Sequence, residues 1–346
     1  MTITILVGDV REKLCTLPDS SVHCVVTSPP YWGLRDYGVA GQIGLEPSPA
    51  EFIATMVGVF EEVRRVLRTD GTCWINMGDS YATSATSAHQ SRTHLSGRND
   101  LNPAYRPGVP AGLKPKDLCM MPHRLAIALQ DAGWWVRQDI VWAKPNPMPE
   151  SVQDRCTKAH EYIFLLTKSD RYHYDADAIK EPVAGDPDAP RNRWDTKDYK
   201  VPGQKPQKRT SRGGKGNSKT FRGGGAYTQS KTFDNSVVAL RETHGNEPNL
   251  TGLRNCRSVW EIATKGCPEA HFATFPPELP ERCIKAGCPV GGVVLDPFFG
   301  AGTTGLVADR LQRDCIGIEL NPAYAEIARR RIQAEASLFA DIKVAT

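Results

Sequence analysis

The sequence contains no apolar run that approaches the ~20 residues needed to cross a membrane as a helix. Its opening stretch, residues 1–7, is too short for a signal peptide and has no basic flank. The ten cysteines include no Cys-x-x-Cys pair, and the spacing of Cys256, Cys267 and His271 fits no standard zinc framework. We therefore expect a cytoplasmic protein with reduced, mostly buried thiols, no metal and no membrane contact.

Net charge is also low, but the cations are concentrated in one segment. The 346 residues carry a net charge of +4, yet residues 191–231 hold twelve Lys or Arg against two Asp. This segment is also rich in glycine and contains interleaved aromatic residues. Such a composition is typical of a flexible linker, and it equally suits contact with a nucleic acid, with cations for phosphates and aromatics for bases.

With 40% apolar and 24% charged residues, the chain has the composition of a globular α/β protein with one large domain and a smaller insert. We expect one part over 1–180, a basic insert over 181–255 and a last part over 256–346. Residues 82–116 are rich in Ser, Thr, Gly, Pro and Arg and lack apolar periodicity. They predict a long mobile loop that is functional or disordered.

Hydrophobic periodicity predicts strands and helices on both sides of the insert. A capping box from Ser48 to Glu51 begins one helix, Asp70-Gly71 is expected to end it, and Asn321-Pro322 is expected to cap the last helix. The expected strands are 3–7, 23–26, 72–77, 135–142, 160–167, 292–295 and 315–318. The expected helices are 10–17, the one that begins at 49, 118–132, 276–286, the one that ends near 311, and the one after 322.

A stiff corner follows the second expected strand, where Thr27 is followed by Ser28, Pro29, Pro30 and Tyr31. Proline fixes its own φ and pushes the preceding residue out of the α region, so the corner is extended. It would hold the Ser28 hydroxyl, backbone carbonyls and the Tyr31 ring at the carboxyl edge of a sheet, where open α/β sheets bind ligands. Rigid acceptors beside an aromatic face suit a planar ring that carries an amino group.

A second motif lies near the end of the chain, where a strand runs into Asp296 and a turn with Gly300 and Gly302 before the next helix. The glycines let the backbone approach a ligand, and the helix offers free N–H groups. Glu319, seventeen residues after Gly302, can accept both hydroxyls of a ribose. The third glycine of the dinucleotide fingerprint is missing, which favours a nucleotide-type cofactor without a pyrophosphate over NAD.

The stretch Asp296-Pro-Phe-x-Gly-x-Gly-Thr-Thr and the Thr-Ser-Pro-Pro-Tyr corner together resemble the amino-methylating DNA methyltransferases that use S-adenosyl-L-methionine. The catalytic motif comes first, the basic region follows and the cofactor motif comes last, which resembles the β class, a circular permutation of the common methyltransferase fold. The resemblance implies a Rossmann-like α/β fold, with helices on both faces of a mostly parallel twisted sheet. It makes residues 181–255 the target-recognition region and double-stranded DNA the substrate.

The resemblance also implies cofactor contacts outside the glycine turn. Residues 271–276 lie where the family has His-Pro-Thr-x-Lys-Pro, and Phe272 and Phe275 depart from that pattern. Asp9 lies where the family has an acidic residue near the cofactor adenine. The implied cofactor-binding residues are Asp9, Thr27, Phe272, Thr274, Asp296, Pro297, Phe298, Gly300, Gly302, Thr303, Thr304, Glu319, Leu320 and Asn321.

The implied catalytic residues are Ser28, Pro29, Pro30 and Tyr31. In this interpretation Ser28 and the Pro29 carbonyl hydrogen-bond the amino group of a base flipped out of the duplex, and Tyr31 stacks on that base. The chain has no Pro-Cys dipeptide, unlike the cytosine-C5 methyltransferases. In the family, enzymes with Ser at the first motif position mostly methylate N4 of cytosine, and enzymes with Asp there mostly methylate N6 of adenine. We expect N4-cytosine, with N6-adenine as the alternative, because a serine hydroxyl can accept from either amine.

Two further interpretations come from other classes. A non-catalytic DNA-binding protein on this scaffold would explain the basic insert, but both motifs are intact. A dehydrogenase is disfavoured by the missing third glycine. For an enzyme of this class we also expect a prokaryotic or phage origin, association with the nucleoid, a cognate restriction endonuclease as a candidate partner, and a monomeric or homodimeric state.

Overall fold

The computed structural model describes residues 1–34, 38–82, 109, 112–182, 253–264, 274–335 and 341–345. The chain divides into two compact units, one of residues 1–179 with 256–346 and one of residues 180–255. The basic segment and most of the 82–116 stretch lie outside the described residues, so what is expected of them stays a prediction. In the second unit, β6 (Glu181–Pro182) pairs antiparallel with β7 (Leu253–Arg254).

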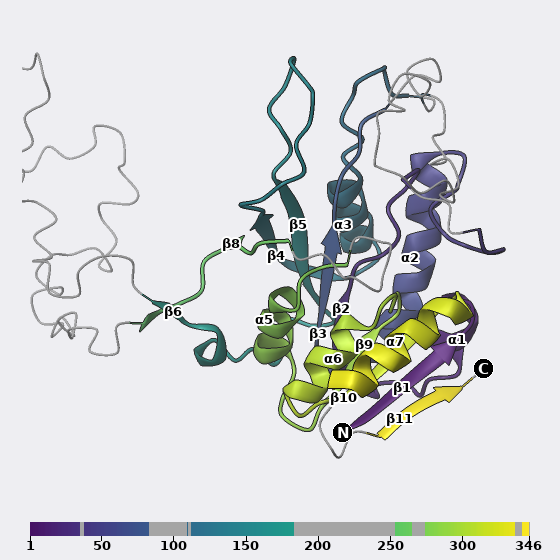
Figure 1. The fold of residues 1–346 in the computed structure, drawn as a ribbon, viewed down its shortest axis with the longest axis vertical. Coiled ribbons are helices and arrows are strands. Elements are labelled where there is room, and N and C mark those ends of the chain that lie inside the picture. The colour runs from purple at the N-terminus through teal and green to yellow at the C-terminus, as the bar shows by residue number, and fades with distance from the viewer. Residues whose placement is uncertain are drawn as a thin grey trace, which may run out of the picture. The chain divides into compact units, whose positions relative to one another are not determined.

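Within the described part of the first unit, nine strands form one sheet in the order β11-β1-β10-β9-β2-β3-β5-β4-β8 (Figure 1). Neighbours are parallel except at β5, which is antiparallel to both β3 and β4. The strands are β1 (Thr2–Val7), β2 (Val22–Thr27), β3 (Leu67–Met77), β4 (Trp135–Ala143), β5 (His160–Thr167), β8 (Val259–Glu261), β9 (Val293–Asp296), β10 (Asp314–Glu319) and β11 (Asp341–Ala345). The expected mostly parallel, Rossmann-like sheet is confirmed.

Early and late strands of the chain alternate in one part of this sheet. The late strands β9 and β10 lie between the early strands β1 and β2. Counted outward from β9, β10 is second and β1 third, so the N-terminal strand occupies an interior place in the order. Carboxyl ends of parallel strands share one edge of a sheet, and the permuted order therefore brings both sequence motifs to the same edge.

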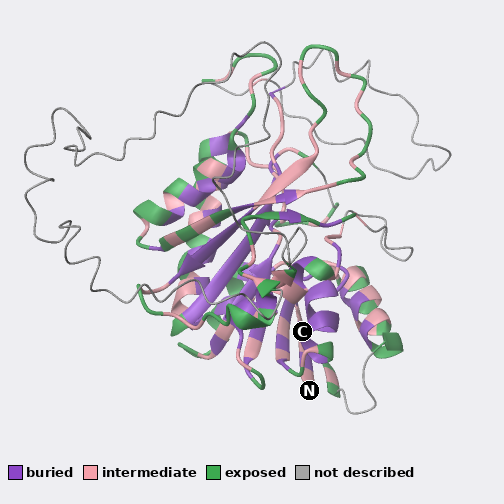
Figure 2. Cartoon of the chain, turned by 90° about the vertical axis from the view of Figure 1, so that its left-hand side faces the viewer, coloured by how far each residue is buried: buried purple, intermediate pink, exposed green. Residues whose placement is uncertain are grey.

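Helices cover both faces of the sheet (Figure 1), as expected. α1 (Val10–Cys15), α2 (Pro49–Val66) and α3 (Met121–Asp131) pack on one face. α5 (Glu278–Gly287), α6 (Thr303–Arg310) and α7 (Pro322–Glu335) pack on the other. Successive strand residues serve opposite faces, so Val25 joins the first core and Val26 the second. Figure 2 shows the resulting buried strands at the centre of the first unit.

The α2 helix begins as expected but ends earlier. The Ser48 hydroxyl accepts from the Glu51 N–H, and Pro49 occupies the first turn. The expectation that Asp70-Gly71 ends the helix was wrong, because α2 ends at Val66 and both residues lie inside β3. A Cβ at Gly71 would lie 2.5 Å from the Leu67 side chain, so the glycine makes room for packing within the strand.

Four other features differ from the sequence-based expectation. α3 begins at Met121 because Leu118 forms a β-bridge with Tyr81, and this pairing closes the base of the long loop. α5 begins at Glu278, two residues later than expected. The strands β8 and β11 were not predicted. β11 is an edge strand of five residues, Asp341–Ala345, and none of them is buried.

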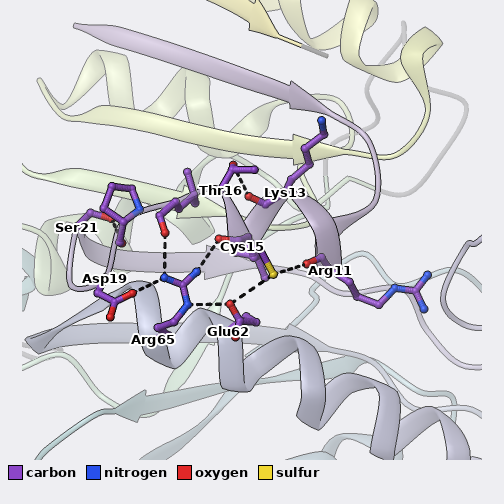
Figure 3. Close-up of polar contacts among 11 residues, drawn as sticks. Arg11, Lys13, Cys15, Thr16, Asp19, Ser21, Glu62 and Arg65 are labelled. Atoms are coloured by element: carbon purple, nitrogen blue, oxygen red, sulfur yellow. Dashed lines mark hydrogen bonds and ion pairs between the residues drawn. The ribbon is translucent and has the colours of Figure 1, made fainter.

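Figure 3 shows how Arg65 of α2 holds the end of α1 in place. Its guanidinium donates to the carbonyls of Leu14 and Leu17 at 2.8 and 2.9 Å and pairs with Asp19 and Glu62. Leu14 lies in the last turn of α1, where carbonyls lack partners inside the helix, and Leu17 lies just after the helix, so Arg65 joins both to α2. Helix α1 starts directly after the β1 turn, so this anchor also fixes one wall of the site described below.

The described helices include none that is long and apolar enough to span a bilayer. The nine described cysteines are free, and six of them are buried. Among the described residues, no three His, Cys, Asp or Glu side chains gather as metal ligands. Cys267 and His271 lie outside the described residues.

Candidate active site

A cavity of about 850 Å³ opens where β1, β2, β3, β9 and β10 end. Its size is within the range of small-molecule sites. Most of the residues predicted from sequence line it, namely Asp9, Ser28, Pro29, Pro30, Tyr31, Thr274, Asp296, Pro297, Phe298, Gly300, Thr303, Glu319, Leu320 and Asn321. Phe272 lies outside the described residues. The two motifs, about 270 residues apart in the chain, therefore face one space.

Asp296 is a nearly inaccessible carboxylate at the floor of the cavity, with 1% of its surface exposed. The hydroxyls of Thr27 and Thr304 donate to its two oxygens at 2.7 and 2.6 Å, and the Phe298 N–H donates at 3.1 Å. Burial raises the pKa of Asp296 to about 6, while these three donors act in the opposite direction. Thr27 and Thr304 are fully buried and hold Asp296 in place, and their expected contact with the cofactor stays a prediction.

The two glycines of the β9–α6 turn have different surroundings. Gly300 has φ +52° and an open space where a Cβ would lie, so a ligand can approach its backbone. Gly302 has φ +76°, and a Cβ there would lie 2.9 Å from the Cβ of Ala328 on α7. The missing side chain of Gly302 therefore makes room for α7, and Gly302 is not among the residues that line the cavity, so its expected contact with a ligand stays a prediction.

Glu319 ends β10 and reaches back to the glycine turn. Its two carboxylate oxygens accept the N–H groups of Gly300 and Asn321, each at 2.8 Å. Burial raises the pKa of Glu319, and those two donors partly counteract the rise. Asn321 also accepts the Ala323 N–H at 2.9 Å, which confirms its expected role as the cap of α7. The carboxylate is thus held rigidly at the cavity wall.

Asp9 lies two residues after the end of β1 and caps α1. Its carboxylate accepts the Arg11 N–H at 2.8 Å and forms an ion pair with the Arg11 guanidinium. The guanidinium is the main cause of the lowered pKa of Asp9. Asp9 therefore stays ionised at the cavity wall. Its pKa is lowered, whereas the pKa values of Asp296 and Glu319 are raised.

The Ser-Pro-Pro-Tyr corner turns Ser28 and Tyr31 toward the same cavity. The Tyr31 hydroxyl donates to Glu161 at 2.8 Å, and its ring lies against Gly78, where a Cβ would come within 2.7 Å of the ring. Burial is the main cause of the raised pKa of Tyr31, with Glu161 adding to it, so the hydroxyl stays protonated. This fixes the ring at one side of the cavity.

Glu161 was missed by the sequence-based prediction. Its carboxylate also accepts from Asn76 at 3.1 Å and forms an ion pair with Lys144, and all these residues line the cavity. The sequence does carry a weak signal, because His160 and Glu161 are polar residues at the start of an otherwise apolar strand. Only the antiparallel direction of β5 places that start at the edge where the parallel strands end.

Comparison with known proteins gives the family. A model of the DNA methylase family that includes N6 and N4 enzymes matches residues 22–330. The chain belongs to this family of amino-methyltransferases. The type II methyltransferase M.SmaI of Serratia marcescens is 43% identical over 328 residues, which cover 95% of this chain and 90% of that protein. M.Cfr9I of Citrobacter freundii is 42% identical over 332 residues, which cover 96% and 88%.

Solved structures show that the methyltransferase shares its fold with these enzymes. The TTHA0409 protein of Thermus thermophilus, in complex with S-adenosyl-L-methionine, matches with a TM-score of 0.58 and 22% identity over 99% of this chain and all of the other. The PvuII DNA methyltransferase matches with a TM-score of 0.56 and 17% identity, and the match covers 98% and 96% of the two chains. The chain is thus a type II DNA amino-methyltransferase that uses S-adenosyl-L-methionine, as the sequence motifs predicted.

The cavity residues of the methyltransferase fit this cofactor. The sulfonium and the amino group of S-adenosyl-L-methionine are cationic, and the buried carboxylate of Asp296 and the partly buried carboxylate of Glu319 line the cavity. The open space above Gly300 leaves room for close approach to the backbone. The carboxylates and the glycine turn come from the late part of the chain, whereas the Ser28–Tyr31 corner comes from the early part, and both groups line the same cavity.

Proposed function

We propose that this methyltransferase modifies the exocyclic N4 of a cytosine that has flipped out of duplex DNA at a specific sequence. The observation that carries the proposal is the position of Ser28. It opens the Ser-Pro-Pro-Tyr corner and lines the same cavity as Gly300 and Glu319. In the family, serine at this position accompanies mostly N4-cytosine, and aspartate mostly N6-adenine. N6-adenine methylation remains the alternative within the same class.

The mechanism follows from the weak nucleophilicity of the amine, whose lone pair is delocalised into the ring. The Ser28 hydroxyl and the Pro29 carbonyl accept hydrogen bonds from the amino group and draw it toward a tetrahedral geometry. When bound, S-adenosyl-L-methionine would supply an electrophilic methyl group: the bond from its sulfur to that methyl would break as the bond to the exocyclic nitrogen forms, S-adenosyl-L-homocysteine would leave, and the proton lost by the nitrogen would pass to water. The two prolines keep these acceptors fixed, so that positioning supplies the main acceleration.

Tyr31 holds the base in this arrangement. Its hydroxyl is bound to Glu161 and its ring is backed by Gly78, so the ring offers one fixed face to a flat ligand. Glu161 is itself held by Asn76 and Lys144, and the side chains of Lys144 and Glu161 are 19% and 15% exposed. A stacking partner that is already immobile loses little conformational entropy when the base arrives.

The base is identified by expressing the protein in a host without DNA methylation and analysing the nucleosides of its DNA by mass spectrometry. We expect mass spectrometry to detect N4-methyldeoxycytidine. Sequencing that distinguishes modified bases should place this nucleoside within a single recognition sequence. The Ser28→Ala variant is the control and should leave the DNA unmodified or nearly so. Detection of N6-methyldeoxyadenosine instead would establish the alternative, and an unmodified genome with tight DNA binding would favour a non-catalytic binder.

The partners follow from the relatives. M.SmaI and M.Cfr9I are bacterial type II methyltransferases. We propose that this enzyme likewise acts beside a cognate restriction endonuclease, in the cytoplasm with the nucleoid, as a monomer or a homodimer. The target-recognition role of residues 181–255 and the cofactor contact of Phe272 are proposed on the same family basis.

A further inference from the structure

The connection between β4 and β5, residues 144–159, extends beyond the sheet on the side of the cavity (Figure 1). It carries an apolar side chain at the mouth of the cavity. Met148 is 71% exposed, the highest fraction among the large hydrophobic side chains in the described part of the chain, and it also lines the cavity. Pro147 and Pro149 flank it and restrict the backbone on both sides.

The strand side of this loop is anchored by Asn146. Its side-chain oxygen accepts the Thr264 N–H at 2.9 Å, and its side-chain nitrogen donates to the Thr264 carbonyl at 3.1 Å. The amide thus pairs with the backbone of the segment that follows β8. Because Asn146 is only two residues before Met148, these two bonds restrict where the methionine lies relative to the cavity.

The returning side of the loop is anchored as well. Arg155 pairs with Glu150 at 2.6 Å and lies 4.0 Å from the centre of the Tyr81 ring, and the Lys158 amine donates to the Asp79 carbonyl at 2.7 Å. These cations are bound within the protein. Met148 is therefore exposed in a loop whose cations Arg155 and Lys158 are held by partners within the protein.

We propose that Met148 is a wedge that enters the base stack and fills the space left by the target nucleotide when it moves into the cavity. The inference rests on the proposed function, because it requires a flipped base. Unstacking a base costs a few kcal/mol, and other proteins insert apolar side chains such as Met, Leu or Pro between base steps to offset it. A methionine in an anchored loop at the mouth of the cavity is suited to this insertion, because it would face the duplex while the flipped base lies inside the cavity.

The test compares Met148→Ala with the wild-type full-length enzyme on two duplexes that carry the mapped recognition sequence. In one, the target base is paired; in the other, it lies opposite an abasic site, where less stacking and pairing is lost. We expect Met148→Ala to lower kcat/KM about tenfold or more on the paired duplex, in line with a flipping cost of a few kcal/mol. On the abasic duplex the loss should be less than about threefold, because that base is already partly released.

A second readout places 2-aminopurine at the target position, where fluorescence rises on flipping. We expect a smaller rise with Met148→Ala and a wild-type rise with Met148→Leu. The matched control is Val290→Ala, since Val290 is 69% exposed but precedes β9 at the opposite edge of the sheet. An equal loss on both duplexes, or no loss on either, overturns the wedge. The wild-type enzyme on the paired duplex reports the proposed function separately, since its failure there refutes that function whatever the ratio between variants.

Discussion

At the scale of single residues, burial moves the pKa of the Asp296 carboxyl toward neutrality. Its pKa is raised to about 6 by burial, so it is mostly ionised at pH 7 and mostly neutral at pH 5. A cationic cofactor favours the ionised form. We therefore expect the affinity for S-adenosyl-L-methionine to be constant above pH 7 and to fall about tenfold between pH 7 and pH 5, as measured by calorimetry.

The control for this prediction is Asp296→Asn. It removes the charge with little change in volume, so the affinity at pH 7 should fall and the dependence on pH should flatten. A residual slope is expected from Glu319, whose pKa is also raised by burial. If Asp296→Asn kept the full pH dependence, the titrating group would be another one, and the assignment of Asp296 to cofactor binding would be wrong.

At the scale of elements, the β9–α6 turn separates a glycine that faces the ligand from one that faces the core. Gly300→Ala places a Cβ in open space at φ +52°, so we expect a stability loss of about 1–2 kcal/mol and a clear loss of cofactor affinity. Gly302→Ala has a similar backbone penalty and also forces α7 away, for a loss of about 2–5 kcal/mol.

Urea unfolding and calorimetric titration of the two variants check this pair together, each serving as the control of the other. The decisive comparison is between the loss of cofactor affinity and the loss of stability in each variant. If Gly302→Ala weakened cofactor binding without a larger loss of stability than Gly300→Ala, the packing role assigned to Gly302 would be refuted. The same outcome would support the role that the sequence had suggested.

At the scale of the whole molecule, the excess of positive over negative charge comes from the basic segment. Residues 191–231 carry a formal charge of +10 while the whole chain carries +4, so the remainder is net −6. Attraction to DNA should therefore depend on that segment. We expect a variant with Lys205, Lys208, Arg209 and Arg212 changed to Gln to bind duplex DNA more weakly, with the slope of log K against log salt reduced by up to about 3–4.

The matched control for the charge change is the pair Arg329→Gln and Arg330→Gln on α7, both of which pair with Glu326. This double variant should keep the salt slope, and both variants should keep the wild-type affinity for S-adenosyl-L-methionine. A salt slope that falls only in the α7 variant would place the DNA contact on the first unit instead. Binding by filter retention across a series of salt concentrations distinguishes these outcomes.

The sequence by itself determined the chemistry and most of the local structure. The Ser28–Tyr31 corner, the Asp296–Gly302 turn and the caps at Ser48 and Asn321 depend on residues that are neighbours in the chain, and such signals can be recognised without a fold. Family resemblance then added the cofactor and the DNA substrate. These predictions agree with the structure and with the family match.

The tertiary structure alone decided what each residue of the site touches. The hydroxyl of Thr27 meets Asp296 across 269 positions, and that of Tyr31 meets Glu161 across 130. Sequence reasoning foresaw neither the Thr27–Asp296 contact nor the role of Glu161, because contacts at such separations depend on strand order and direction. The physical reason is that neighbouring residues in the chain determine whether a segment forms a strand, while the packing of the whole sheet determines which strands lie beside it.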